Sequence, residues 1–299
     1  MSGRLPPWLR KPIRDHERVQ ALHRRLRGKN LHTVCEEARC PNIGECFSRN
    51  MATFLLMGPN CSRNCGFCNI GSGPLAPLDP DEPKNVASAA AEMQLVHVVI
   101  TSVTRDDLPL GGAEHFFLTV VEVKKALPKA TIEVLTPDFG GNREALQKIA
   151  AAPIDVFNHN METVARLYSK VRAPADYRQS LDVLRAMAQL RPDTIIKSGL
   201  MLGLGETDDE VHVVLQDLRS ANTTALTMGQ YLRPRLANLP VERYVEPEAF
   251  AEWQKTALAL GFSRVAAAPL VRSSYLADRL MHDGQPLAET PVNGDKLID

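Results

Sequence analysis

Short apolar runs rich in β-branched residues alternate with amphipathic stretches along most of the chain. The apolar runs predict six strands, at residues 53–57, 96–101, 131–135, 154–158, 194–201 and 225–231. The amphipathic stretches predict helices at 85–94, 114–126, 143–151, 162–169, 177–190 and 208–220. One more helix, at 250–260, precedes a short apolar run at 264–267. The pattern therefore predicts an α/β protein.

Regular alternation of strands and helices indicates βαβ units and a parallel sheet. Six units could close into a partial barrel, whereas a full barrel needs eight. A doubly wound open sheet would give the same local pattern, so periodicity alone leaves both architectures open. Residues 72–83 include five Pro or Gly residues and predict a loop. Residues 281–299 are mostly polar without a period and predict a flexible tail.

The composition excludes several classes of protein. Hydrophobic residues make up 44% and charged residues 23%, as in soluble globular proteins. Lys plus Arg and Asp plus Glu are equal at 35 each, without the basic excess of a nucleic-acid-binding protein. No apolar run reaches the roughly 18 residues that cross a membrane, and the N-terminus does not resemble a signal peptide. We expect a cytoplasmic protein that binds neither nucleic acid nor membrane.

All six cysteines lie between residues 35 and 68, which in a long chain suggests metal binding rather than disulfides. Cys61, Cys65 and Cys68, the second trio, have the spacing Cys-x3-Cys-x2-Cys directly after the first predicted strand. Three thiolates can hold three irons of a cubane cluster and leave the fourth iron open for a small molecule. A zinc site is the alternative, but no fourth Cys or nearby His follows.

Cys35, Cys40 and Cys46, the first trio, are spaced Cys-x4-Cys-x5-Cys and suggest a second cluster. Buried thiols or a structural zinc site are the alternatives for this trio. Residues 4–29 hold many Arg and Lys residues, which form either a solvated face or a docking surface for an acidic partner.

The spacing of the second trio, with Phe67 before its last cysteine, resembles the radical S-adenosylmethionine superfamily. The two trios in this order resemble the signature of the lipoyl synthase family. Further segments agree with this family along nearly the whole chain, at 101–108, 111–112, 157–163, 229–232 and 272–275, and the glycine-rich segment 199–206 resembles a motif of the superfamily. Read alone, the glycine patterns fit ordinary turns or close packing, and 272–275 fits a turn or cap. The chain departs from the family at Asn238, where many members have His, and at Ala268, where Gly is usual.

The resemblance implies a partial (β/α)6 parallel barrel of the radical S-adenosylmethionine type in residues 51–232. An N-terminal extension, residues 1–50, would carry the first trio. A C-terminal extension, residues 233–280, would complete the site of that trio, and residues 281–299 would form the flexible tail. The two extensions are expected to meet over the open face of the barrel.

The resemblance also implies two [4Fe–4S] clusters and S-adenosylmethionine as cofactors. The second trio would bind the reducing cluster, whose open iron chelates S-adenosylmethionine and whose electron releases a 5′-deoxyadenosyl radical. The ligands of the auxiliary cluster would be Cys35, Cys40, Cys46 and Ser274. The same four residues would be catalytic, because this cluster takes part in the reaction. Residues expected near the bound nucleotide are Phe67, Gly111, Gly112, Asn158, Arg178 and Glu206. For Arg178, an exposed helix charge is the alternative.

The implied reaction inserts two sulfur atoms at carbons six and eight of a protein-bound octanoyllysine, with the auxiliary cluster as sulfur source. The implied partners are an octanoylated lipoyl-carrier domain (a dehydrogenase E2 subunit or a glycine-cleavage H protein), an electron donor such as ferredoxin or flavodoxin, and an iron–sulfur cluster carrier. Two other functions fit part of the pattern. A different radical enzyme would lack one of the paired motifs, and a two-cluster electron carrier would close both clusters with four ligands.

Overall fold

The computed structural model describes residues 5–10, 16–49, 51–275 and 277–282. Most of the predicted tail, residues 283–299, lies outside the described residues. No helix in these ranges is long and apolar enough to span a membrane.

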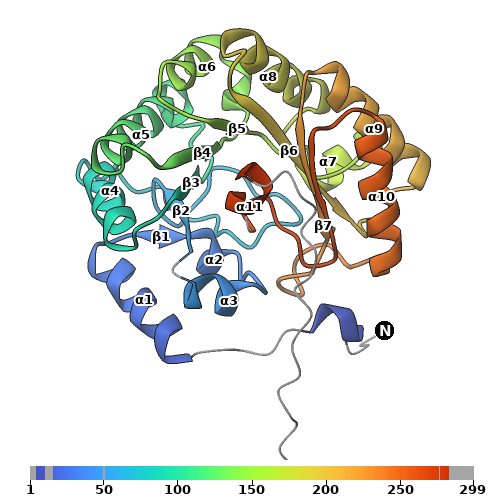
Figure 1. Ribbon diagram of the computed structural model, residues 1–299, viewed down its shortest axis with the longest axis horizontal. Helices are drawn as coiled ribbons and strands as arrows, with labels where there is room; N and C mark the ends of the chain where they lie inside the picture. Colours follow the sequence, from blue (N-terminus) through green and yellow to red (C-terminus); the bar gives the residue numbers. More distant parts are fainter. Residues whose placement is uncertain (1–4, 11–15, 50, 276, 283–299) are drawn as a thin grey trace, which may run out of the picture.

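One eight-stranded sheet curves through the molecule, and its strand order follows the sequence from β1 to β8 (Figure 1). The short strand β1 (His32–Thr33) pairs antiparallel with β2, and the remaining strands are parallel. These are β2 (Thr53–Leu56), β3 (His97–Ser102), β4 (Thr131–Leu135), β5 (Val156–Asn158), β6 (Ile195–Leu202), β7 (Ala225–Gln230) and β8 (Arg264–Ala267). A doubly wound sheet would reverse its order at a switch point. The sequential order therefore selects the partial barrel.

Six amphipathic helices cover the outside of the sheet (Figure 1). They are α4 (Glu82–Glu92), α5 (Ala113–Ala126), α6 (Arg143–Ala150), α8 (Tyr177–Leu190), α9 (Asp208–Ser220) and α10 (Pro247–Ala259). Helix α9 shows why the sequence forms them. Thr207 and Glu210 form a reciprocal capping box at its start. Val211, Val214, Leu215 and Leu218 then recur at helical spacing and are buried.

The helix predicted at 162–169 is wrong in its first half. Glu162 has a φ of 67° and forms an isolated bridge with Leu200 of β6. Its backbone N–H donates to Gly199 O at 2.9 Å, and its carbonyl accepts from Met201 N at 2.9 Å. This pairing with β6 prevents the backbone of Glu162 from entering a helix. Only the short helices η4 (Ala165–Leu167) and α7 (Tyr168–Val171) follow.

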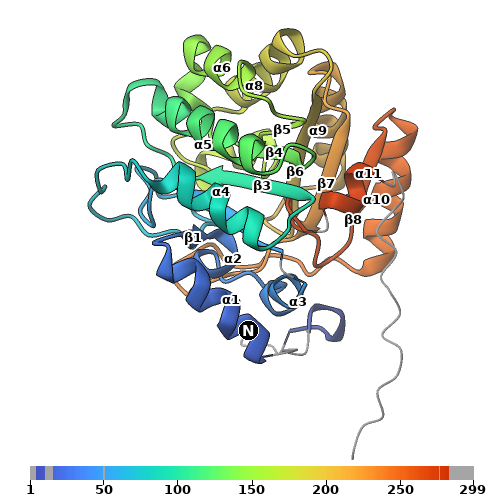
Figure 2. The ribbon, with the colours of Figure 1, turned by 60° about the vertical axis from the view of Figure 1, so that its left-hand side comes forward.

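The N-terminal extension contains helices that the sequence pattern did not predict: η1 (Pro7–Leu9), α1 (His16–Gly28), α2 (Val34–Glu37) and α3 (Ile43–Ser48). Figure 2 shows α1, α2 and α3 grouped at one end of the barrel. Leu22 and Leu26 of α1 are buried in the main core. Burial of these two leucines attaches the extension to the barrel.

The chain after β8 folds back onto the barrel and meets the N-terminal extension. Gln230 N donates to Pro269 O at 3.0 Å, so the returning segment lies beside β7. Asn42 Nδ2 donates to Leu270 O at 2.7 Å, and Tyr275 Oη donates to Glu45 Oε2 at 3.0 Å. Helix α11 (Ala277–His282) then packs Leu280 and Met281 into a small separate core. Met281, predicted to begin the flexible tail, is only 7% exposed.

Candidate active site

A cavity of about 500 Å³, the barrel cavity, opens at the carboxyl ends of the parallel strands. Residues at the ends of β2, β3, β4, β6 and β7 line it, together with all three thiols of the second trio. The carboxyl end of a parallel barrel is where the loops of barrel enzymes build their active sites. The position of the second trio therefore agrees with a catalytic role.

Backbone N–H groups point at two thiols of the second trio. Cys61 Sγ accepts from Arg63 N at 3.4 Å and from Thr104 N at 3.2 Å, and Cys68 Sγ accepts from Ile70 N at 3.4 Å. Burial raises the pKa of Cys65 to about 11 and that of Cys68 to about 12. These thiols therefore keep their protons until a metal displaces them. When Cys61 and Cys68 are deprotonated, these backbone N–H groups stabilise their thiolates.

An arginine within the second trio anchors its loop to the barrel. The Arg63 guanidinium donates to both oxygens of Asp106 at 2.8 and 2.9 Å, and to both oxygens of Asp138 at 2.8 Å. Burial alone would raise the pKa of Asp138, but the Arg63 guanidinium holds it well below its usual range. Hydrogen bonds from Arg63 likewise lower the pKa of Asp106. This double clamp fixes the loop between the first two cysteines.

The opposite side of the same loop is covered by the C-terminal extension. Asn238 Nδ2 donates to Gly66 O at 3.2 Å and to Cys68 O at 2.8 Å. Leu239 N donates to Gly66 O at 3.0 Å. Asn238, one of the two departures from the family pattern, thus fastens the C-terminal extension to the loop of the second trio.

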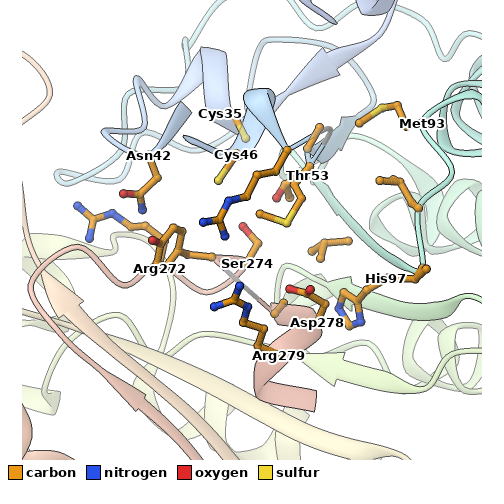
Figure 3. A pocket seen from close by; sticks show the side chains of 18 of the residues that line it. Cys35, Asn42, Cys46, Thr53, Met93, His97, Arg272, Ser274, Asp278 and Arg279 are labelled. Atoms are coloured by element: carbon orange, nitrogen blue, oxygen red, sulfur yellow. The ribbon is translucent and has the colours of Figure 1, made fainter. Parts of the chain in front are cut away.

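A second cavity of about 370 Å³, the junction cavity, lies where the two extensions meet. Its walls include all three thiols of the first trio and Ser274. Figure 3 shows Cys35, Cys46 and Ser274 around this cavity. The structure therefore brings Ser274 to the same cavity as these cysteines. Burial raises the pKa of Cys35 to about 12.

The two cavities adjoin each other. Five residues line both of them: Cys35, Cys40, Thr53, Arg272 and Ser274. The barrel cavity is therefore lined by all three thiols of the second trio and by Cys35 and Cys40 of the first trio. A molecule in the barrel cavity would lie beside thiols of both trios.

The donor atoms suit iron–sulfur clusters. All six cysteines are free thiols. No group of three or more His, Cys, Asp or Glu side chains in the described parts of the chain is placed to hold one metal ion. A cubane cluster does not need such a group, because each thiolate binds a different iron atom. Asn160 Oδ1, a buried acceptor without a partner, adds an unsatisfied polar atom at the wall of the barrel cavity.

The barrel cavity also holds charged residues to which the sequence assigned no role. Arg172 donates to Tyr168 Oη and to Asn160 O, both at 2.7 Å, and its charge lies close enough to Cys65 to favour the thiolate. Burial raises the pKa of Glu162, which accepts from Asn160 Nδ2 at 3.0 Å. Asn160 and Glu162 lie in the family-like segment 157–163, which could have indicated them. Arg172 had no sequence signal.

Of the residues expected near the nucleotide, Phe67 lines the barrel cavity. The other five do not line its wall. Asn158 donates to Glu133 inside the barrel at 3.1 Å, and Arg178 is exposed on α8. Glu206 accepts from Gly203 N and Leu204 N at 2.6 and 2.8 Å. Gly111 and Gly112 form the turn η2 (Pro109–Gly112), where both have positive φ. For these five, nucleotide contact stays a prediction.

Comparison with known proteins identifies the family. Residues 55–218 match the family model of the radical SAM superfamily, and residues 2–40 match the N-terminal domain of lipoyl synthase of the radical SAM family. The lipoyl synthase of Methylobacillus flagellatus is 51% identical over 276 residues, which cover 92% of this chain and 85% of that protein. The lipoyl synthase of Caldanaerobacter subterraneus is 51% identical over 280 residues, covering 93% and 97%.

Solved structures agree in fold. Methylornithine synthase superimposes with a TM-score of 0.56 at 17% identity, covering 83% of this chain and 74% of that one. SuiB of Streptococcus suis, solved with S-adenosylmethionine bound, gives a TM-score of 0.52 at 8% identity and covers 73% of this chain and 50% of that one. These similarities, with the predicted family and fold class now confirmed, show that the chain belongs to the lipoyl synthase family of the radical SAM superfamily.

Proposed function

We propose that the two trios divide the lipoyl synthase reaction between them, around one cavity that residues of both trios line. The reaction inserts two sulfur atoms at carbons six and eight of an octanoyl chain carried on a protein lysine. The observation that carries the proposal is the shared lining of the two cavities, because Cys35, Cys40 and Ser274 face both. One acyl chain in the barrel cavity can therefore approach both trios without leaving the protein.

The cofactors of this family are two [4Fe–4S] clusters and S-adenosylmethionine. Cys61, Cys65 and Cys68 would hold the reducing cluster, and their number leaves one iron open for S-adenosylmethionine. Cys35, Cys40, Cys46 and Ser274 would hold the auxiliary cluster. When bound, these groups supply a carbon-centred radical that can act on an unactivated C–H bond, and sulfide that can join the resulting carbon.

The remaining residues of the barrel cavity would bind the octanoyl chain, hold the loop of the second trio in place and exclude water. Leu55, Val103, Leu135 and Met201 give the barrel cavity apolar walls, which suit an octanoyl chain. Arg63 holds the loop of the second trio through Asp106 and Asp138. The two trios use all six cysteines, so no cysteine is left over to donate sulfur. This count supports the auxiliary cluster as the sulfur source.

Phe67 is the residue that we place beside the nucleotide, because it lines the barrel cavity next to the second trio. We also propose nucleotide contact for five residues that do not line the barrel cavity: Gly111, Gly112, Asn158, Arg178 and Glu206. Glu206 already uses both carboxylate oxygens within the fold, and Asn158 Nδ2 donates to Glu133, while the buried Asn158 Oδ1 has no partner. Rearrangement would be needed before either contacted a nucleotide.

The partner in this reaction is an octanoylated lipoyl-carrier domain. We propose that this carrier domain is acidic and that basic residues of the present chain attract it. Several residues of the basic stretch at 4–29 are already paired. Lys29 and Arg25 contact Glu92 at 2.8 and 3.6 Å, and Arg27 lies 3.7 Å from Glu36. Arg39 and Arg233 are exposed and line the barrel cavity. These two arginines offer a better-placed attraction for an acidic carrier.

We further propose ferredoxin or flavodoxin as electron donor and an iron–sulfur cluster carrier as the source of new clusters. The cluster carrier would be needed in every catalytic cycle, because each cycle would consume the auxiliary cluster. Six free thiols are suited to a reducing compartment such as the cytoplasm.

One labelling experiment tests the division of roles. The chain is reconstituted with heavy sulfide and supplied with reductant, S-adenosylmethionine and an octanoylated carrier domain. We expect 5′-deoxyadenosine and a lipoyl product with two heavy sulfur atoms, and the reaction should stop after one turnover. Mass spectrometry reads both products.

Two variants serve as matched controls. Cys65→Ala should abolish 5′-deoxyadenosine and lipoyl formation together. Cys40→Ala should abolish lipoyl formation and retain part of the nucleotide cleavage. Equal loss of nucleotide cleavage in both variants, or light sulfur in the wild-type product, would contradict the proposal.

A further inference from the structure

The segment that carries Ser274 lies directly against two barrel strands. A Cβ at Gly229 of β7 would collide with Val271 O. A Cβ at Gly199 of β6 would lie 3.1 Å from Ser273 Oγ. Both strands therefore have a glycine where the returning chain lies against them. Ser273, next to Ser274, is held against the sheet at this point.

A fully buried ion pair lies beneath the same segment. Lys197 of β6 and Glu133 of β4 have side chains that are 0% exposed. Lys197 Nζ donates to the two Glu133 oxygens at 2.8 and 3.1 Å. Its remaining hydrogen bond, at 2.6 Å, goes to the backbone carbonyl of Ser273. One ammonium thus joins β4, β6 and the returning segment.

Glu133 is equipped to keep this ammonium in place. Asn158 Nδ2 donates to Glu133 Oε1 at 3.1 Å, and His97 Nε2 lies 3.2 Å from Oε2. Burial would raise the pKa of Glu133, yet Lys197 and His97 hold it at about 2. The carboxylate therefore stays charged and fixes the position of Lys197.

A buried ion pair is by itself weak evidence for a role in stability. Desolvation of two charges often cancels their attraction, and an apolar pair of similar volume often stabilises a protein interior as well. What an apolar pair cannot supply is a donor to Ser273 O. A second side chain acts on the same residue, since Asn160 Nδ2 donates to Ser273 Oγ at 2.6 Å.

We infer that Lys197 is a positioning residue for the auxiliary site: by holding the backbone of Ser273, it keeps the neighbouring Ser274 hydroxyl at the cavity of the first trio. This inference rests on the proposed role of Ser274 as a cluster ligand. Lys197 touches no thiol and acts only through Ser273. Its removal should therefore weaken the fourth ligand of the auxiliary cluster and leave the second trio intact.

The test replaces both charges at once, because Lys197→Met alone would leave Glu133 buried without its partner. The K197M/E133L variant keeps an apolar, filled interior and lacks the hydrogen bond to Ser273. Glu133→Gln is the comparison variant. It leaves Lys197 buried without its counter-charge, so its melting temperature should fall, but the donor to Ser273 O remains. Thermal unfolding shows that each variant folds.

Each variant is also made in a full-length chain that carries C61A, C65A and C68A. These three substitutions remove the reducing cluster, so the auxiliary cluster is observed by itself. Mössbauer spectra and iron content report whether the fourth iron is held. We expect K197M/E133L to match S274A, with about 10–100-fold weaker retention of that iron. E133Q should retain the fourth iron as the parent chain does, although it unfolds at a lower temperature. In chains with all six cysteines, K197M/E133L should cleave S-adenosylmethionine at the parent rate.

Combination with Ser274→Ala separates positioning from general loosening of the fold. If Lys197 acts through Ser274, K197M/E133L adds no further loss to S274A, whereas independent effects would add. Additive losses, an equal loss in E133Q, or a four-iron spectrum in K197M/E133L would each overturn the inference. Loss of the proposed function has a different signature: S274A itself would then retain the parent spectrum, and the parent product would carry light sulfur.

Discussion

Arg63 shows how one side chain organises the second trio. It lies between Cys61 and Cys65 in the sequence, and its guanidinium is only 10% exposed. Its partners come from two other places, Asp106 after β3 and Asp138 after β4. Asp138 is completely buried, so its charge depends on this guanidinium. A cysteine loop attached to two strand ends presents its thiols in a fixed geometry, which metal sites require.

We predict that Arg63→Gln lowers the free energy of unfolding by about 3 kcal/mol, because Asp138 is left buried without its counter-charge. The loop of the second trio should loosen at the same time. Nucleotide cleavage should then fall about 10–100-fold, as with other residues that support metal ligands. Denaturant unfolding and 5′-deoxyadenosine yield measure the two effects.

Arg166→Gln is the control for this prediction. Arg166 contacts Glu210 at 2.6 Å but lies on the surface, where an ion pair contributes little. Both readouts should remain close to those of the parent chain. If the two variants lose stability equally, burial of Asp138 is not the reason for the effect.

At the scale of elements, the site depends on how loops and short segments lie against regular strands. The parallel strands end in loops that carry the second trio, Thr104 and Pro137 to the barrel cavity. The C-terminal segment follows a different principle, since it enters beside β6 and β7 where glycines give it room. Asn42 and Glu45 of the N-terminal extension then bind it from the other side. The junction cavity exists because three separate parts of the chain meet there.

We predict that Gly229→Ala destabilises the protein by about 1–3 kcal/mol, because the added methyl group collides with Val271 O and the backbone must move. The movement displaces Ser274, so retention of the auxiliary cluster should fall with stability. Thermal unfolding and iron content measure these changes. Gly28→Ala, at a position with open space, is the matched substitution and should change neither. Unchanged iron content in Gly229→Ala would show that the returning segment can shift without affecting the site.

At the scale of the whole molecule, the barrel buries several ionisable groups whose protonation links stability to pH. His159 is fully buried, and its Nδ1 donates to Thr136 O at 2.9 Å. Burial, and then the charge of Arg172, lower the pKa of His159 to about 3. The folded protein therefore keeps this imidazole neutral where the unfolded chain, with a pKa of about 6.5, binds a proton.

The sign of the pH effect follows from this difference. The stability due to neutral His159 is complete above pH of about 6.5 and declines as the pH falls toward 3. We predict that unfolding of the cluster-free chain at pH 5 costs about 2 kcal/mol less than at pH 7.5. The stability due to the lowered pKa values of Glu133 and Asp138 is lost at lower pH, as the pH falls below the ordinary carboxyl pKa of about 4.

His159→Gln should flatten this dependence, whatever its effect on the stability at neutral pH. His212→Gln, on helix α9, is the matched control and should retain the slope of the parent chain. Melting temperatures measured by circular dichroism from pH 5 to 7.5 decide the outcome. A slope that persists in His159→Gln would assign the effect to another group.

Local patterns in the sequence determined the element types, the family and the thiols that form the two trios. Strand β4 and helices α8 and α9 begin and end where the periodicity predicted them, because alternation and helical spacing are properties of neighbouring residues. The cysteine spacing is equally local. The α/β class and the lipoyl synthase family therefore followed from short stretches of chain.

Tertiary structure alone decided how these parts meet. The choice of a partial barrel over a doubly wound sheet depends on strand order, which no single βαβ unit specifies. Helices α1 to α3 were not predicted from the sequence, because their apolar residues are buried by packing against the barrel. Arg172 and Lys197 looked like ordinary charged positions, since their partners lie in other strands and loops. Contacts between distant segments arise only when the sheet curves and the two extensions close over it, and these contacts place Ser274 at the first trio.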